Sequence, residues 1–164
     1  MKHRLKIMLL VAAFGISACT NPGRFDNGTA GADGLNGAVS DPASPAYFQQ
    51  VVGDRILFLV NQSTLSDSAR AVLVTQARWM LQNPEYTAII EGHADERGTR
   101  EYNLALGARR ANSAQEFLIS QGISANRLRT VTFGKERPVE ICSAESCYNQ
   151  NRRAVTVLAA GGLS

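Results

Sequence analysis

Residues 91–112 read EGHADERGTREYNLALGARRAN, and this stretch joins a predicted strand to a predicted helix. Just upstream, Tyr86 to Glu91 is rich in aromatic and β-branched residues, which favour extended structure. Downstream, the segment from about Arg100 to Gln121 indicates a helix, and Gly122 is the residue type that commonly ends one. The loop from Gly92 to Thr99 lies between them. We therefore expect a strand, a polar loop and a long helix in direct succession.

Three further strands and one further helix are predicted around this unit. The strand candidates are Arg55 to Val60, Arg127 to Phe133 and Arg153 to Leu158. The helix is predicted to begin after Ser66, which is a favourable N-cap, and to stop at Asn83-Pro84.

This order of elements, β-α-β-α-β-β, predicts an α/β (α+β) fold built as a two-layer sandwich. Strands joined by a helix are expected to pair in parallel, because a parallel pair needs a crossover connection. The last strand should complete a mixed four-stranded sheet with the helices on one face.

Side chains that suit a zwitterionic ligand gather where the loop meets the long helix. Asp95 follows the carboxyl end of a strand, where open α/β sheets tend to place ligand sites. Asn103, Leu106 and Arg110 have the spacing i, i+3 and i+7, which puts them on one helix face. Asp95 can accept hydrogen bonds from an ammonium group, and Arg110 offers a planar fork for a carboxylate. The alternative is an internal Asp95–Arg110 salt bridge with no ligand.

The first residues have the features of a secretory signal. Lys2, Arg4 and Lys6 form a basic start, and an apolar run follows from Ile7 to Ile16. That run is shorter than the roughly 20 apolar residues that span a bilayer. We expect residues 1–18 to be a signal peptide that is removed.

The cleavage site carries a cysteine, and this is its informative feature. Ile16-Ser17-Ala18-Cys19 resembles a bacterial lipobox, which implies that Cys19 is acylated and becomes the first residue of the mature chain. Thr20 is not the aspartate that favours inner-membrane retention, so the resemblance implies the outer membrane. An ordinary cleavage site beside a stray cysteine is the alternative.

The net charge of the chain comes from this signal. The sequence has 17 Lys and Arg against 14 Asp and Glu, and removal of the three basic residues in 1–18 leaves 14 of each. A basic footprint for nucleic acid is therefore not supported. Residues 19–46 are rich in Gly, Asn, Asp, Ser, Ala and Pro, which predicts a lipidated N-terminus and flexible linker. Residues 47–164 are then one domain of ordinary size.

The stretch 91–112 closely resembles the OmpA-like domain family, and within it the peptidoglycan-associated lipoproteins. The shared motifs are EGHADERGT, EYN and LGxRRAN in this stretch, then FGKExP at 133–138 and NRRAV at 151–155. The resemblance covers most of residues 47–158, and the lipobox and linker agree with it.

This resemblance implies a ligand and the residues that bind it. The ligand is meso-diaminopimelate in the peptide stem of peptidoglycan, whose side-chain end carries an ammonium and a carboxylate. The family's aspartate and arginine fall on Asp95 and Arg110. Its Tyr-Asn pair falls on Tyr102 and Asn103, and Leu106 occupies the apolar position beneath.

The resemblance also implies a role and partners. The chain is expected to tether the outer membrane to the cell wall within the Tol–Pal system, supporting envelope integrity and cell division. TolB is the implied soluble partner, with other Tol proteins as further candidates. The alternative is a paralogous OmpA-like wall-binding lipoprotein without a Tol partner. An enzyme such as an amidase is not expected, because no serine or cysteine stands in a triad context, and no cofactor is implied.

Four other features complete the sequence-based picture. His93, Asp95 and Glu96 fit no standard zinc spacing, so we expect no metal and a structural role for His93. Cys142 and Cys147 flank a short loop, and either a disulfide or two free thiols is compatible with that spacing. Arg153 is expected near the Asp95 loop. Residues 57–62, LFLVNQ, depart from the aspartate-rich stretch of many relatives.

Overall fold

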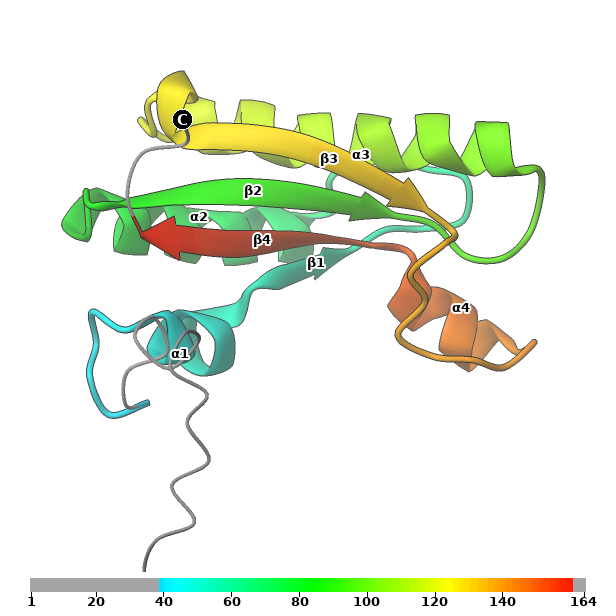
Figure 1. Cartoon of the computed structure of the whole chain (residues 1–164), viewed down its shortest axis with the longest axis horizontal. Coiled ribbons are helices and arrows are strands. Elements are labelled where there is room, and N and C mark those ends of the chain that lie inside the picture. Colours follow the sequence, from blue (N-terminus) through cyan, green and yellow to red (C-terminus); the bar gives the residue numbers. More distant parts are fainter. Residues whose placement is uncertain (1–38, 161–164) are drawn as a thin grey trace, which may run out of the picture.

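The computed structural model describes residues 39–160 (Figure 1), and its four strands and two long helices begin close to the positions that the sequence predicts. In chain order they are α1 (Pro45–Tyr47), the π-helix η2 (Phe48–Gly53), β1 (Arg55–Leu57), α2 (Asp67–Gln82), β2 (Tyr86–His93), α3 (Arg100–Ser120), the 3₁₀-helix η3 (Ala125–Arg127), β3 (Leu128–Gly134), α4 (Glu145–Asn151) and β4 (Arg153–Ala160). The short helices α1, η2, η3 and α4 have no counterpart among the predicted elements.

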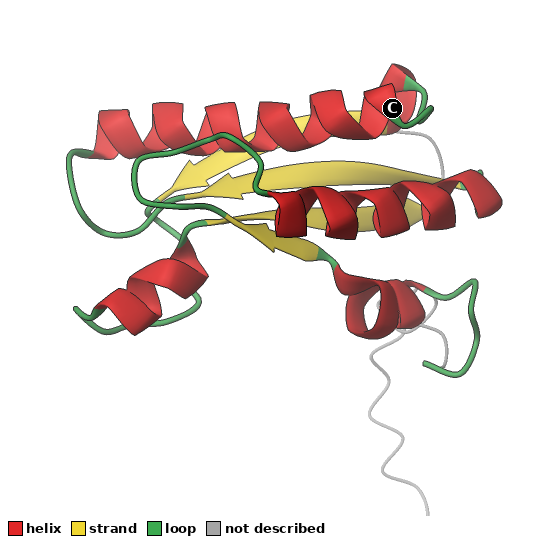
Figure 2. Cartoon of the chain, turned by 180° about the vertical axis from the view of Figure 1, so that it is seen from behind, coloured by secondary structure: helices red, strands yellow, loops and turns green. Residues whose placement is uncertain are grey.

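The four strands form one sheet with the order β1-β4-β2-β3. β2 and β3 pair in parallel, and β4 is antiparallel to both of its neighbours. Figure 2 shows α2 and α3 over one face of this sheet. The predicted two-layer α/β sandwich with a mixed sheet is therefore confirmed. The expected direct pairing of the first two strands is wrong, because β4 lies between β1 and β2 and hydrogen-bonds to both.

The two long helices begin at capping residues that satisfy their first free N–H groups. The Ser66 hydroxyl accepts a hydrogen bond from the Ala69 amide at 3.2 Å, and Thr99 does the same for Tyr102 at 3.2 Å. The Thr99 cap fixes the point where the Asp95 loop becomes α3. The loop and the helix start are therefore held in one geometry.

A close contact between two glycines sets the distance between α3 and the end of β2. A Cβ atom built on Gly92 would lie 1.9 Å from the carbonyl oxygen of Gly107. No side chain fits in that space, so the helix backbone rests directly on the strand. This contact places the middle of α3 beneath the residues that follow β2, including Asp95.

The hydrophobic core lies between the sheet and the two long helices. Its most buried members include Leu73 and Met80 of α2, Ile90 of β2 and Leu118 of α3. Phe48 of η2 closes one end of this core and is fully buried.

Packing onto this core begins before Tyr47, the first residue of the predicted domain. The Trp79 indole N–H donates to the carbonyl oxygen of Pro42 at 2.7 Å, and Ser44 is buried. Residues 42–46, which the sequence assigns to the linker, therefore contact the folded domain. The signal peptide, Cys19 and most of the linker lie outside the described residues.

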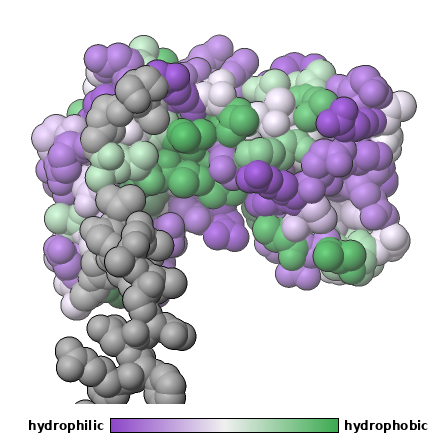
Figure 3. Space-filling model, viewed as in Figure 1, coloured by the Kyte–Doolittle hydropathy of each residue, from purple (hydrophilic) through white to green (hydrophobic). Residues whose placement is uncertain are grey.

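The face of the sheet opposite α2 and α3 is more exposed to solvent. Figure 3 shows apolar side chains gathered over the middle of the sheet, with hydrophilic ones around them. Val131 and Val157 on this face are 36% and 37% exposed. Between residues 39 and 160, no helix is long and apolar enough to cross a membrane.

Candidate functional site

Asp95 lies in the loop after β2 and is held by two arginines. One carboxylate oxygen accepts the Arg97 amide at 3.1 Å and the Arg97 Nε at 3.3 Å. The other accepts Arg97 Nη2 at 2.7 Å and Arg152 Nη1 at 3.3 Å. Burial on its own raises the pKa of Asp95, but the hydrogen bonds from Arg97 and Arg152 outweigh it and hold that pKa below its usual value. Asp95 is therefore a buried anion at neutral pH.

Arg110 lies in the middle of α3 and is fully buried. Its guanidinium donates to three backbone carbonyl oxygens: Gln62 at 2.8 Å, His93 at 2.8 Å and Leu59 at 3.1 Å. Burial lowers the pKa of Arg110 to about 10, so the group stays charged at neutral pH. The hydrogen bonds that solvate this buried cation are therefore made to backbone carbonyl oxygens.

Asp95 and Arg110 are neighbours without forming an ion pair. The carboxylate acts on Arg110 through space, but the ion pairs of Asp95 in the described chain are made with Arg97 and Arg152. The alternative of an internal Asp95–Arg110 salt bridge is therefore not realised. Arg97 and Arg152 each pair with both Asp95 and Glu145. Arg110 makes no ion pair within residues 39–160, and an uncompensated guanidinium favours an added carboxylate.

The other three predicted site residues lie along the first turns of α3. Asn103 is buried, and its side-chain amide donates to the Arg97 carbonyl at 2.8 Å. Leu106 is buried beneath it, and Tyr102 is 43% exposed at the start of the helix. Asn103 therefore holds the shape of the Asp95 loop, while Tyr102 presents its ring to solvent.

The segment 142–148 lies beside the Asp95 loop and contacts it. A disulfide joins Cys142 to Cys147, which settles the choice that their spacing left open. Arg152 Nη2 donates to Glu145 at 2.6 Å, and the Arg97 guanidinium lies 4.5 Å from the centre of the Tyr148 ring. The loop and this segment are thus joined through charged and aromatic contacts.

The Asn-Arg-Arg motif reaches the site through Arg152 instead of Arg153. Successive side chains of an extended chain point to opposite faces, so the two arginines diverge. Arg153 donates to the Arg137 carbonyl at 3.2 Å, and its charge acts on His93. Arg153 thus lies near the start of the loop at His93, as expected, while the direct contact with Asp95 is made by Arg152.

His93 is the last residue of β2 and is almost fully buried. Its ring stacks on Phe133 with 5.5 Å between centroids. Burial, with the nearby charges of Arg153 and Arg137, lowers the pKa of His93 to about 4. The described residues contain no group of three or more histidine, cysteine, aspartate or glutamate side chains placed to hold a metal ion.

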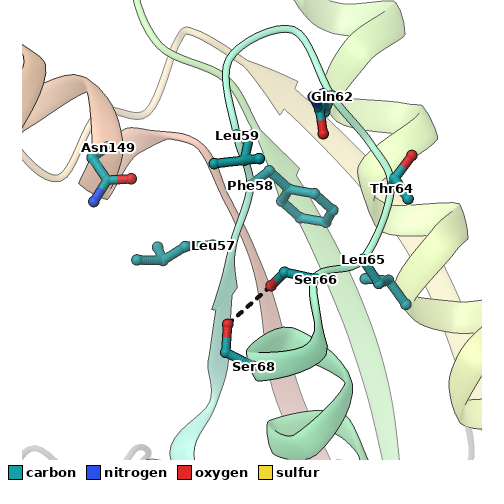
Figure 4. Close-up of a pocket in the computed structure, with 9 residues that line it drawn as sticks. All are labelled: Leu57, Phe58, Leu59, Gln62, Thr64, Leu65, Ser66, Ser68 and Asn149. Carbon is teal, nitrogen blue, oxygen red and sulfur yellow. Dashed lines mark hydrogen bonds between the residues drawn. The ribbon is translucent and has the colours of Figure 1, made fainter.

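A groove of about 280 Å³ lies beside the segment that follows β1. Figure 4 shows its lining, in which Leu57 and Leu59 face the side of Asn149, and Ser66 bonds to Ser68 at 2.9 Å. Asp95 and Arg110 do not line it. The backbone of the same segment is held from within, because the Leu59 and Gln62 carbonyls accept from Arg110.

Comparison with known proteins identifies the family of this chain. The model of the OmpA family matches residues 57–152. The chain belongs to the OmpA family. It is 48% identical to the peptidoglycan-associated lipoprotein of Mesorhizobium japonicum over 95% of this chain and 92% of that protein, and 46% identical to its namesake from Rhizobium meliloti over 95% and 88%.

Solved structures of OmpA-family domains agree with this fold. The crystal structure of the peptidoglycan-associated lipoprotein from Burkholderia pseudomallei is 34% identical, with a TM-score of 0.66 and coverage of 74% of this chain and 98% of that one. The C-terminal domain of Helicobacter pylori MotB matches with a TM-score of 0.61 at 16% identity, covering 65% and 84%, which shows a shared fold. Neither the family nor these relatives bears the name of an enzyme.

Four residues at this candidate site were not singled out from the sequence. Arg97 stands two residues after Asp95, a spacing at which an aspartate often accepts the backbone N–H. Arg152 belongs to the same motif as Arg153, and a strand register one residue different would have selected it. Glu145 and Tyr148 lie in a helix whose sequence carries no clear periodic signal.

Proposed function

We propose that this OmpA-family chain is an outer-membrane lipoprotein, acylated at Cys19, whose domain binds peptidoglycan without covalent chemistry. Its similarity to the peptidoglycan-associated lipoproteins supports this role, because identity extends over 95% of the chain. A match limited to the domain, as with MotB at 16% identity, would support only the fold. The lipid and the domain together would join outer membrane and wall.

The proposed ligand is meso-diaminopimelate of the stem peptide. Asp95 receives the ligand's ammonium, and the buried guanidiniums of Arg110 and Arg152 attract its carboxylate. The observation that carries this assignment is the state of Arg110, a fully buried cation that makes no ion pair among the described residues. Each Nη atom of an arginine carries two N–H groups, so Nη1 and Nη2 of Arg110 each have one beyond the bond already made.

The remaining proposed residues support this pair. Asn103 keeps the loop in shape through its bond to the Arg97 carbonyl. In this proposal Tyr102, which is 43% exposed, covers the aliphatic part of the ligand. Leu106 packs below as the apolar floor.

Pelleting with purified sacculi tests the site. The full mature chain in detergent should pellet with peptidoglycan, and Asp95→Asn should lose that association while remaining folded. Glu116→Gln is the matched control, since it makes the same chemical change at an exposed position of α3. Equal pelleting of Asp95→Asn and the wild type would contradict the proposed site.

Two further measurements address the anchor and the partner. Mass spectrometry of the membrane-extracted protein should find lipid on Cys19, and an unmodified residue 19 would contradict lipidation. We further propose that the chain acts within the Tol–Pal system with TolB as its soluble partner. Titration with TolB should give a complex, and its absence would favour a paralogous wall-binding lipoprotein.

A further inference from the structure

The acceptor capacity of Asp95 is fully used by its own chain. An ionised carboxylate offers about four lone-pair positions. Four donors occupy them here: the amide, Nε and Nη2 of Arg97, and Nη1 of Arg152. A ligand ammonium can therefore bind Asp95 only if one of these donors leaves.

The two arginines differ in how easily they can leave. The Arg152 side chain is 4% exposed and also donates to the carbonyl of Phe58 at 3.1 Å. The Arg97 side chain is 44% exposed, and its guanidinium makes no hydrogen bond to the backbone among the described contacts. Arg97 is therefore the donor group that can swing into solvent, while Arg152 stays in place.

Arg97 is also held from its outer side. Its guanidinium lies 4.5 Å from the centre of the Tyr148 ring, and Nη1 lies 3.6 Å from the Glu145 carboxylate. A cation over an aromatic face is attracted to it. Both groups belong to the segment 142–148, which the Cys142–Cys147 disulfide closes.

The segment 142–148 also hydrogen-bonds to Glu96, the loop residue between Asp95 and Arg97. Glu96 accepts hydrogen bonds from the Ser143 hydroxyl at 2.7 Å and from the Tyr148 hydroxyl at 2.8 Å. These bonds fix the Tyr148 ring relative to the Asp95 loop. The ring is thereby kept where it supports Arg97.

We propose that Arg97 is an intramolecular competitor for the ammonium position on Asp95, and that the disulfide-closed segment 142–148 sets the strength of this competition. The inference rests on the proposed function, since it assumes that Asp95 receives the ligand's ammonium. The apparent affinity for the stem peptide is then the intrinsic affinity multiplied by the fraction of molecules in which Arg97 has left Asp95. Arg97 acts as a positioning residue that limits affinity and selects ligands whose ammonium displaces it.

Calorimetric titration of the full mature chain with a diaminopimelate-containing tripeptide tests the competitor. Arg97→Met removes the guanidinium and retains most of the side-chain length, and it should bind about fivefold more tightly, as expected for loss of a partly exposed ion pair. Arg97→Lys keeps a cation near Asp95 and should stay closer to the wild type. The same tripeptide acetylated on its side-chain amine lacks the ammonium that is proposed to meet Asp95, so Arg97→Met should bring no gain with it.

The outcomes separate this inference from the proposed function. If Arg97→Met binds the tripeptide no more tightly than the wild type does, Arg97 is not a competitor for Asp95. The same conclusion follows if Arg97→Met also binds the acetylated tripeptide more tightly than the wild type does. Asp95→Asn should bind the tripeptide poorly in the same assay. If Asp95→Asn binds as the wild type does, it is the proposed ligand site that fails.

A double-mutant cycle tests the role of the segment. Cys142→Ser with Cys147→Ser should raise affinity about twofold in the wild-type background, because the support of Arg97 loosens. In the Arg97→Met background the same change should have no effect. Tyr148→Leu, which keeps the disulfide and removes the ring face and hydroxyl, should follow the same pattern. Equal effects in both backgrounds would overturn the role of the segment.

Discussion

Arg110 donates from Nη1 to the carbonyl oxygen of His93 at 2.8 Å, which ties the middle of α3 to the last residue of β2. This bond lies two residues before Asp95, so the proposed cation also builds the backbone that carries the proposed anion. Arg127 makes similar contacts elsewhere, donating to the carbonyls of Met80, Asn83 and Tyr86. Arginines in this domain thus hold chain segments together as well as providing charge.

Removal of the Arg110 side chain should destabilise the domain. Arg110→Ala leaves the buried carbonyl oxygen of His93 and the partly buried ones of Gln62 and Leu59 without their donor, at a cost of about 3 kcal/mol in the free energy of unfolding. Urea denaturation measures this cost, and Arg109→Ala, at the exposed neighbour, should change stability by less than about 0.5 kcal/mol. Similar losses for both variants would contradict the structural part of this account.

The contact between Gly92 and Gly107 predicts a strong effect of a single methyl group. In Gly92→Ala the new Cβ meets backbone 1.9 Å away, so the helix must move, at about 3 kcal/mol. Gly122→Ala is the comparison, because it meets no atom within 4 Å and bears only the strain of φ +98°. That strain is worth about 1 kcal/mol. In thermal unfolding, Gly92→Ala should therefore have the lower melting temperature of the two variants.

The buried His93 predicts a loss of stability in mild acid. Its pKa is about 4 in the folded chain and near 6.5 when unfolded, so the unfolded state binds the extra proton first. Stability should therefore fall as the pH drops from about 6.5 to 4, by up to about 3 kcal/mol. Denaturation at pH 7 and pH 4.5 measures this, and His93→Gln should show a smaller difference between the two values. The pKa of Asp95 is held below its usual value, so the stability that its ionised form contributes is lost only at lower pH.

The start of the folded region predicts a difference between two truncated chains. A chain from Tyr47 lacks the Pro42 carbonyl that accepts from Trp79 and the Ser44 hydroxyl that caps α1. It should be less stable than a chain from Val39 by about 1–2 kcal/mol. Equal melting temperatures for the two chains would show that residues 39–46 add nothing to the domain.

Local signals were sufficient for most of the fold. Ser66 and Thr99 act through bonds to residues three positions away, and the apolar spacing of α2 reports its buried face directly. The place of β4 was not predictable in this way, because its insertion between β1 and β2 depends on pairing between distant residues. The strand β1 is shorter than predicted, since the chain after Leu57 leaves the sheet and its carbonyls accept from Arg110 and Arg152.

In the candidate site, too, the residues that are close in sequence were predictable and the distant ones were not. Asp95, Asn103 and Leu106 are joined by a short loop and one helix face, and the sequence places them together. The partners that hold Asp95 from the far end of the chain are different, because Arg152 is 57 residues away and reaches Asp95 only through the register of β4. The segment 142–148 contacts the loop through Glu96 and Arg97, and these contacts have no periodic pattern to reveal them.

A crystal structure of the full mature chain with a diaminopimelate-containing tripeptide tests the central claim most directly. The account predicts the ligand ammonium within hydrogen-bonding distance of the Asp95 carboxylate, its carboxylate beside Arg110 and Arg152, and the Arg97 side chain turned away from Asp95. A tripeptide bound elsewhere, with the 2.7 Å contact between Arg97 and Asp95 intact, would contradict it.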